Sequence, residues 1–239
     1  MSVGEILEID PQQIIKKQKI IDNYKVLKYS QYVLHTGARN FDETLGGGFY
    51  KQKKYLIFGA NKTGKTQLCH QLCVQAYIQF SKINKKHGMM KNQFIFYFDT
   101  ENTFRPERLK ELIINHRLEY TKLLKSILVS KIMSNSALFL SLQELENLLE
   151  KNYINVLIID TLNNHYNSEL ANKSISLIKT KDNFLKILDK INKLTKKHNL
   201  ITVTNAQVIS NRVRETMIRV LPVGNHLLNQ YFSEYVYLD

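Results

Sequence analysis

A glycine-rich octapeptide between two apolar segments limits the possible folds of this chain more than any other feature. Residues 59–66 read Gly-Ala-Asn-Lys-Thr-Gly-Lys-Thr and match the pattern G-x-x-x-x-G-K-[ST] in full. The apolar run at 55–58 predicts a buried strand before the octapeptide, and helical apolar spacing from Gly64 to about Phe80 predicts a helix after it. So short a pattern can occur by chance, but a strand, a glycine turn and a helix N-terminus in this order form a P-loop. Its backbone N–H groups surround a phosphate.

The last two residues of the loop carry side chains suited to phosphate and metal binding. Lys65 would reach the β- and γ-phosphates of ATP, and the Thr66 hydroxyl would ligate Mg²⁺. A P-loop also needs an acidic residue near the metal, at the end of a neighbouring strand. Asp160 follows the apolar run at 156–159 and is the candidate.

Hydrolysis of a nucleotide requires a further group that orients and deprotonates a water. Asp99 and Glu101 follow the apolar run at 94–98, where such a group is expected. Either carboxylate could instead cap a helix or lie in a solvated turn, and the residues alone leave both readings open.

Apolar runs alternate with helical patterns along the chain. We predict strands at 55–58, 94–98, 127–129, 156–159, 200–204 and 235–238, and helices at 64–80, 106–120, 141–151 and 180–197. This alternation predicts an α/β fold with a mostly parallel sheet flanked by helices. We expect one domain over residues 35–239, preceded by a helical arm over residues 1–34.

The charge balance is compatible with a polyanionic partner. Lys and Arg number 34 and Asp and Glu 21, so the formal net charge is 34 − 21 = +13. Nucleic acid is the usual polyanion, although a biased genomic base composition would also raise the lysine content.

Cys69 and Cys73 are spaced for core packing on one helix rather than for a metal or disulfide site. With neither a signal peptide nor a membrane segment in the sequence, we expect a cytoplasmic protein without membrane contact.

The segment 99–108, Asp-Thr-Glu-Asn-Thr-Phe-Arg-Pro-Glu-Arg, is more specific than the P-loop. It closely resembles the block after the second core strand in archaeal RadA and eukaryotic recombinases of the RecA superfamily. Segments 45–48 (Leu-Gly-Gly-Gly), 203–208 (Val-Thr-Asn-Ala-Gln-Val) and 222–226 (Pro-Val-Gly-Asn-His) extend the resemblance over roughly residues 35–239. The resemblance implies a RecA-like P-loop NTPase core.

The resemblance also implies roles for individual residues. Glu101 would activate the water, Arg108 would flank the adenine, and Gln207 would sense the γ-phosphate and lead into a DNA-binding loop. The implied catalytic set is Glu101, Lys65 and Gln207. The implied nucleotide-binding residues are Gly59, Ala60, Asn61, Lys62, Thr63, Gly64, Lys65, Thr66, Gln67 and Arg108, and the metal ligands are Thr66 and Asp160. Because Ala206 stands where the family has none, Asn205 could take the place of Gln207.

Two loops would hold DNA by the same resemblance, at about 165–178 and 208–222. Their candidate contacts are Lys173, Arg212, Arg214 and Arg219, which could otherwise be solvated surface residues. The first loop lacks the arginines and glycines of true recombinases, and the chain shows neither a preceding helix-hairpin-helix domain nor the Phe-x-x-Ala docking peptide. The chain is therefore most similar to an archaeal RadA paralogue of the RadB type.

The leading hypothesis is an ATP- and DNA-binding accessory factor in homologous recombination and DNA repair, with a weak or DNA-dependent Mg²⁺-ATPase activity. Its expected partners are single-stranded or branched DNA and a RadA-type recombinase or another paralogue, in the nucleoid of an archaeal cell, and it could form oligomers. Two alternatives are a full strand-exchange recombinase and a RecA-like scaffold or signalling ATPase without DNA. Steep salt dependence of DNA binding would exclude the scaffold. A small-molecule P-loop kinase would leave the 99–108 segment unexplained.

Overall fold

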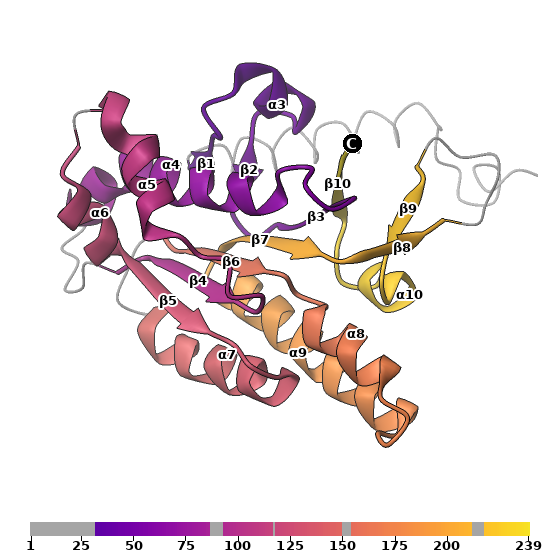
Figure 1. The fold of residues 1–239 in the computed structure, drawn as a ribbon. Helices are drawn as coiled ribbons and strands as arrows, with labels where there is room; N and C mark the ends of the chain where they lie inside the picture. The colour runs from indigo at the N-terminus through magenta and orange to yellow at the C-terminus, as the bar shows by residue number, and fades with distance from the viewer. Residues whose placement is uncertain (1–31, 87–92, 117, 150–153, 212–217) are drawn as a thin grey trace, which may run out of the picture. The chain divides into compact units, whose positions relative to one another are not determined.

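The computed structural model describes residues 32–86, 93–116, 118–149, 154–211 and 218–239 (Figure 1). Residues 34–239 form one compact unit, and residues 1–33 fall outside it. The arm predicted over residues 1–34 lies almost wholly outside the described residues. It stays a prediction, as does its boundary with the domain at 35–239.

The described elements alternate between strands and helices along the chain. In order they are β1 (Val33–Leu34), α3 (Arg39–Thr44), β2 (Phe49–Tyr50), β3 (Lys54–Gly59), α4 (Lys65–Lys86), β4 (Ile95–Asp99), α5 (Pro106–Ile113), the 3₁₀ turn η1 (Ile114–His116), α6 (Tyr120–Ser126), β5 (Ile127–Lys131), α7 (Asn135–Leu149), β6 (Val156–Asp160), α8 (Asn164–Ala171), α9 (Leu177–Lys197), β7 (Ile201–Ala206), β8 (Val208–Ser210), β9 (Val220–Pro222), α10 (Asn225–Leu228) and β10 (Glu234–Leu238).

Six strands form the central sheet, in the order β10-β3-β7-β6-β4-β5. Every neighbouring pair is parallel, and the register places Asp99 opposite Asp160 and Phe58 opposite Ala206. The carboxyl ends of all six strands therefore meet at one edge of the sheet, where α/β proteins bind their ligands. All six predicted strands are present, and the predicted α/β fold with a mostly parallel, helix-flanked sheet is confirmed.

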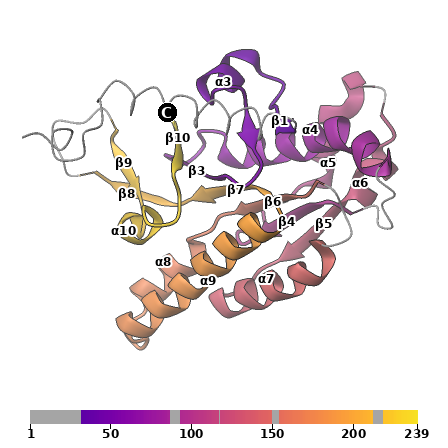
Figure 2. The same ribbon diagram turned by 180° about the vertical axis from the view of Figure 1, so that it is seen from behind.

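Helices cover both faces of this sheet. Helix α4 lies on one face, and α7 and α9 lie side by side on the other (Figures 1 and 2). Alternate residues of a strand point to opposite faces, so Phe96 and Phe98 of β4 join the core cluster under α7 and α9. Tyr97 and Asp99, the alternate residues of the same strand, belong to the other face. Burial of each large apolar side chain contributes about 1.5–3 kcal/mol.

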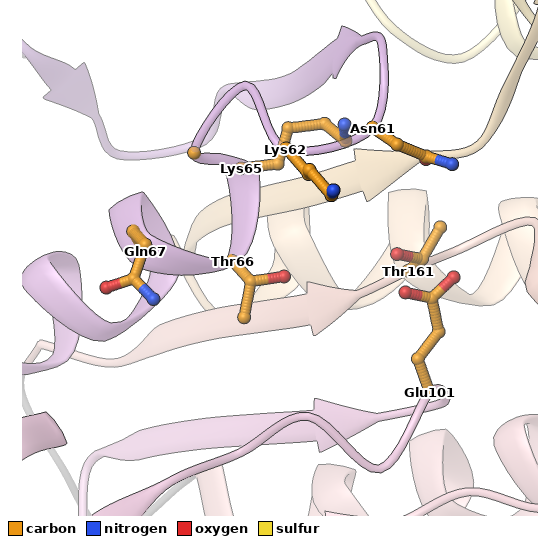
Figure 3. A pocket seen from close by; sticks show the side chains of 8 residues that line it. Asn61, Lys62, Lys65, Thr66, Gln67, Glu101 and Thr161 are labelled. Atoms are coloured by element: carbon orange, nitrogen blue, oxygen red, sulfur yellow. The ribbon is translucent and has the colours of Figure 1, made fainter.

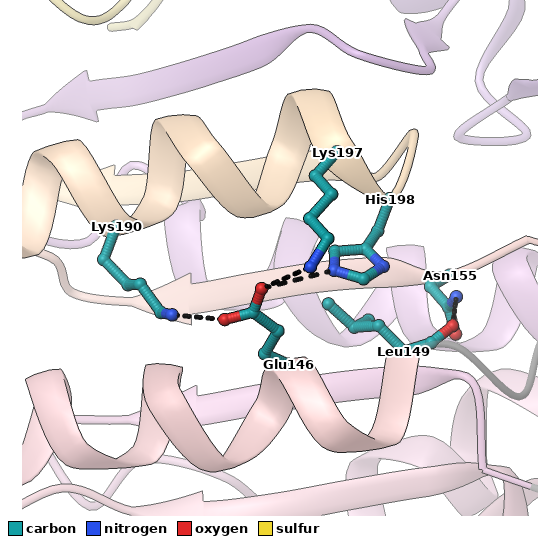
Figure 4. A network of polar contacts seen from close by, with 6 residues as sticks. All are labelled: Glu146, Leu149, Asn155, Lys190, Lys197 and His198. Carbon is teal, nitrogen blue, oxygen red and sulfur yellow. Dashed lines mark hydrogen bonds and ion pairs between the residues drawn. The ribbon is translucent and has the colours of Figure 1, made fainter.

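Helices α7 and α9 are also joined by a charged cluster (Figure 4). The Glu146 carboxylate accepts hydrogen bonds from Lys190 Nζ at 2.5 Å and Lys197 Nζ at 2.8 Å. The imidazole of His198 lies 3.9 Å from the same carboxylate. Hydrogen bonds from the two lysines lower the pKa of Glu146 to about 2, so this carboxylate is charged at neutral pH.

The helix predicted from Pro106 to about Tyr120 was wrong in extent. Helix α5 ends at Ile113, and α6 begins at Tyr120 after a 3₁₀ turn. The Tyr120 hydroxyl donates to the Pro106 carbonyl at 3.0 Å, which holds α6 against the start of α5. Leu123 of α6 is fully buried. The chain turns between α5 and α6, and α6 then leads directly into β5. Neither glycine nor proline marks this turn in the sequence.

Other predicted boundaries differ as well, and helix α4 continues to Lys86 rather than ending near Phe80. Helix α7 begins before the predicted residue 141 because the Ser134 hydroxyl accepts a hydrogen bond from the Ala137 N–H at 3.0 Å and caps the helix. Residues 165–171 of the predicted loop 165–178 belong to helix α8, in which Tyr166 is buried and stacks on Phe184 with ring centroids 4.2 Å apart. The predicted loop 208–222 begins and ends as the antiparallel hairpin β8–β9.

Cys69 and Cys73 are both buried in α4 as free thiols, as the core-packing prediction requires. Burial raises the pKa of each thiol, and the nearby Asp160 carboxylate raises it further. Among the helices of the described segments, none combines the length and apolar character that crossing a membrane requires.

Candidate nucleotide-binding site

Two glycines allow the backbone path of the loop between β3 and α4. Gly64 has φ = +94°, a left-handed conformation that side-chain-bearing residues rarely adopt. At Gly59 a Cβ atom would lie 2.1 Å from the Leu238 carbonyl oxygen, so the approach of β10 excludes any side chain there. Glycine is therefore required at position 64 for its backbone conformation and at position 59 because no side chain fits there.

The loop borders a cavity of about 350 Å³ at the carboxyl edge of the sheet (Figure 3). Glu101 and Lys62 point into this space from opposite sides. Its lining residues are Asn61, Lys62, Gly64, Lys65, Thr66, Gln67, Glu101 and Thr161. The P-loop and the segment after β4 therefore face each other across one space.

The Lys65 ammonium group lies along the P-loop itself. It donates to the carbonyl oxygens of Gly59 at 2.9 Å and Ala60 at 2.6 Å. Burial lowers the pKa of Lys65, while the charges of Glu101 and Asp160 oppose this shift. The Lys65 side chain is thus a hydrogen-bond donor at the border of the cavity.

Asp160 lies at the carboxyl end of β6 and is fully buried. Its Oδ1 lies 3.3 Å from the Thr66 hydroxyl and accepts from the Asn205 amide at 2.6 Å. Its Oδ2 accepts from the Tyr97 hydroxyl at 2.6 Å and the Thr103 hydroxyl at 3.2 Å. These donors satisfy a carboxylate that would otherwise be costly to bury. The hydroxyl and carboxylate oxygens of Thr66 and Asp160 fit Mg²⁺, which prefers oxygen ligands.

The two carboxylates after β4 have different surroundings. Asp99 is 4% exposed, and its carboxylate accepts backbone N–H groups from Glu101, Thr103 and Phe104 at 3.2, 3.1 and 2.9 Å. It therefore shapes the segment that follows the strand. Glu101 is exposed and lines the cavity, so of the two candidates it alone has the location of a water-activating group.

His70 of α4 also holds this segment in place, although no sequence pattern indicated this residue. Its Nε2 accepts the Arg105 N–H at 2.9 Å, and its Nδ1 lies 2.8 Å from the Thr66 carbonyl oxygen. Because Nε2 must accept, the ring proton lies on Nδ1 and the imidazole is neutral. The ring stacks on Phe104 with centroids 5.3 Å apart. His70 thus ties the first turn of α4 to the segment that carries Glu101.

Gln207, rather than Asn205, contacts Glu101. The Gln207 side-chain amide donates to Glu101 Oε1 at 2.7 Å. Asn205 is fully buried and donates instead to Asp160 and, at 3.3 Å, to the Cys69 sulfur. Ala206 is the last residue of β7 and belongs to the core cluster on the opposite face. Strand alternation therefore turns both Asn205 and Gln207 toward the site, at different depths.

Arg108 lies beside the cavity on α5. Its Nε donates to the Gln67 side-chain oxygen at 2.7 Å, and its guanidinium pairs with Glu111 at 2.7 Å. The structure thus connects Arg108 to the cavity through Gln67, which lines it. Its predicted contact with adenine stays a prediction.

The residues predicted to contact DNA lie on two different segments. Lys173 is exposed in the turn between α8 and α9, and Arg219 is exposed beside β9. That turn and the β8–β9 hairpin lie apart in both views of the ribbon (Figures 1 and 2). Arg212 and Arg214 lie outside the described residues.

The parallel sheet and the P-loop at its carboxyl edge define a P-loop α/β protein with a RecA-like core. The model of the Rad51 family matches residues 28–237, and the chain belongs to this family within the RecA/RadA superfamily. The chain is also 26% identical over 220 residues to the meiotic recombination protein DLH1 of Candida albicans. That alignment covers 90% of this chain and 66% of DLH1. The predicted superfamily is confirmed, whereas the narrower likeness to an archaeal RadB-type paralogue stays a prediction.

Proposed function

We propose that this protein binds Mg²⁺-ATP, hydrolyses it slowly, and acts on DNA as an accessory factor in homologous recombination and repair. The observation that carries the proposal is the position of Glu101 in the P-loop cavity, with its carboxylate held by Gln207. A phosphate-binding loop and a positioned carboxylate across one cavity are the parts that nucleotide hydrolysis requires.

Each side chain has a distinct task in this proposal. The loop N–H groups and Lys65 bind the β- and γ-phosphates, and Lys65 exchanges its two carbonyl acceptors for phosphate oxygens. Thr66 and Asp160 hold Mg²⁺, which supplies positive charge against the phosphate oxygens. Glu101 orients a water and accepts its proton, while Gln207 stands beside it as a sensor of the terminal phosphate. Arg108 and Gln67 border the position of the base.

The DNA role is supported by charge and by family. The net charge of +13 favours a polyanionic partner. Gln207 leads directly into the β8–β9 hairpin, so a nucleotide-dependent change at Gln207 would reach Arg219 on that hairpin. The name of DLH1 places that relative in meiotic recombination. We propose single-stranded or branched DNA as the ligand and a recombinase of the same superfamily as the protein partner.

Fluorescence anisotropy with labelled single-stranded DNA, with and without Mg²⁺-ATP and across a salt series, tests the proposal. Wild-type protein should bind with an affinity that falls steeply with salt and changes on addition of ATP. Lys65→Ala should lose the response to ATP and the hydrolysis of ATP. Lys86→Ala removes one positive charge at the far end of the same helix and serves as the matched control.

The alternatives predict other results. Failure of wild-type protein to bind DNA at low salt would refute the DNA role and favour an ATPase scaffold. Cooperative filaments on single-stranded DNA in electron micrographs would favour a full strand-exchange recombinase. An ATP response that survives in Lys65→Ala would contradict the assignment of the P-loop as the nucleotide site.

A further inference from the structure

Three asparagines surround Gln207, and together the four residues form a carboxamide cluster: Asn163, Asn164, Asn167 and Gln207. The asparagines lie in the first turn of α8 and the residue before it. Asn164 Oδ1 accepts from Gln207 Nε2 at 2.9 Å, and Asn167 Nδ2 donates to Gln207 Oε1 at 2.9 Å. Both ends of the Gln207 amide are therefore held by α8, a helix far from Gln207 in the sequence.

The backbone around the cluster determines which way each amide points. A carbonyl can only accept, so the Thr100 carbonyl, 2.7 Å from Asn164 Nδ2, turns Asn164 Oδ1 toward Gln207. Gln207 must present its Nε2 to that oxygen, and the second proton of Nε2 then reaches Glu101 Oε1 at 2.7 Å. The opposite orientation of Gln207 would bring its oxygen against the oxygens of Asn164 and Glu101. Asn167 excludes that orientation again by donating to Gln207 Oε1.

Asn163 fixes the backbone beneath the cluster. It is fully buried, and its Oδ1 accepts the Gln207 N–H at 2.7 Å. Its Nδ2 donates to the carbonyl oxygens of Gln207 at 3.0 Å and Val223 at 2.9 Å. With its backbone held on both sides, Gln207 can change partners only through its side chain. The orientation of its amide is thus set by Asn164 and Asn167.

We propose that Asn164 and Asn167 are positioning residues for ATP hydrolysis, acting on Glu101 through Gln207. They hold the Gln207 amide so that it occupies one oxygen of the Glu101 carboxylate and leaves the other directed into the cavity for the water. This inference rests on the proposed ATPase function and adds its positioning residues. Because both asparagines belong to α8, any contact that shifts this helix also changes the orientation of Glu101.

Asn167→Asp tests the inference with almost no change of shape. The substitution replaces the donor that faces Gln207 Oε1 with a carboxylate oxygen, and the repulsion between the two oxygens displaces the Gln207 amide from the position in which its Nε2 reaches Glu101. We expect kcat for ATP hydrolysis to fall by roughly tenfold or more, since a hydrogen bond to a charged group is lost. KM for ATP and the melting temperature should stay near the wild-type values, because the P-loop and the core are untouched.

Two further variants provide matched controls. Ser168→Asp adds the same charge on the same helix at an exposed residue without a hydrogen bond to Gln207 among the described contacts, and kcat should stay within about twofold of wild type. Asn164→Asp loses the hydrogen bond to the Thr100 carbonyl but keeps an acceptor for Gln207 Nε2, so it should lower kcat less than Asn167→Asp does. Asn167→Ala removes the donor without adding charge and replaces Asn167→Asp if that variant melts early.

A double-mutant comparison shows whether Asn167 acts through Gln207. In a Gln207→Leu background, Asn167→Asp should cause no further loss of kcat. The inference is overturned if Asn167→Asp has wild-type kcat, or if it costs the same factor with and without Gln207. A wild-type protein that hydrolyses no ATP overturns the proposed function and this inference with it. Hydrolysis by wild type with an unaffected Asn167→Asp variant overturns this inference alone.

Discussion

Replacing Tyr97 with phenylalanine removes one donor from the buried carboxylate of Asp160 and leaves the ring in place. The Tyr97 hydroxyl donates to Asp160 Oδ2 at 2.6 Å, and both side chains are fully buried. A hydrogen bond to a charged group contributes about 1.5–3 kcal/mol. Thr103 donates to the same oxygen at a longer 3.2 Å and would not replace the lost bond. We therefore expect Tyr97→Phe to lower the free energy of unfolding by about 1.5–3 kcal/mol.

Urea denaturation followed by circular dichroism measures this change directly. For a domain of this size, 1 kcal/mol corresponds to roughly 2–4 °C in melting temperature, so a fall of about 3–12 °C should accompany it. Tyr237→Phe is the matched control, since its hydroxyl contacts the exposed Asp239 at 3.3 Å and should contribute less than about 0.5 kcal/mol. Equal stability of the two variants would refute the view that Tyr97 stabilises the Asp160 charge.

Three other predictions concern charge, backbone conformation and thiol burial. Glu146→Gln should destabilise the fold by about 1 kcal/mol at pH 7. Because the pKa of Glu146 is lowered, this contribution is present above about pH 4.5 and is lost as pH falls toward 2. The unfolding free energies of wild type and Glu146→Gln should therefore converge in acid. Gly64→Ala should lower stability by about 1–2 kcal/mol through the strained φ of +94° and abolish binding of a fluorescent ATP analogue, whereas unchanged binding would contradict the geometry of the loop. Cys69 and Cys73 should react with a thiol reagent only after denaturation, and rapid labelling of native protein would show that α4 is not packed as described.

The main features of the fold could be predicted from local patterns. Each strand of the sheet appears in the sequence as an apolar run, and the glycines at 59 and 64 mark the P-loop because backbone geometry excludes other residues there. Periodicity placed the helices but not their limits. The start of α7 depends on one capping hydroxyl, Ser134, and the break before α6 on a contact between Tyr120 and Pro106.

The roles of individual residues in the candidate site were harder to predict from the sequence. Asp99 and Glu101 are equivalent in sequence pattern, and only the backbone N–H groups around Asp99 show that it shapes the chain. Tyr97 lies two residues before Asp99 on the same strand face, so strand alternation could have indicated it. Asn163 and His70 gave no comparable signal, because their partners lie 44 and 35 residues away.

The sequence by itself determined the class of fold and the phosphate loop, since these follow from strand and helix periods and from glycine geometry within about twenty residues of chain. Only the tertiary structure decided that Gln207 rather than Asn205 faces Glu101. That contact joins residues 106 positions apart, and its direction is set by hydrogen bonds from α8. Local patterns contain no information about such a contact, because it exists only once the parallel strands bring their carboxyl ends to one edge of the sheet.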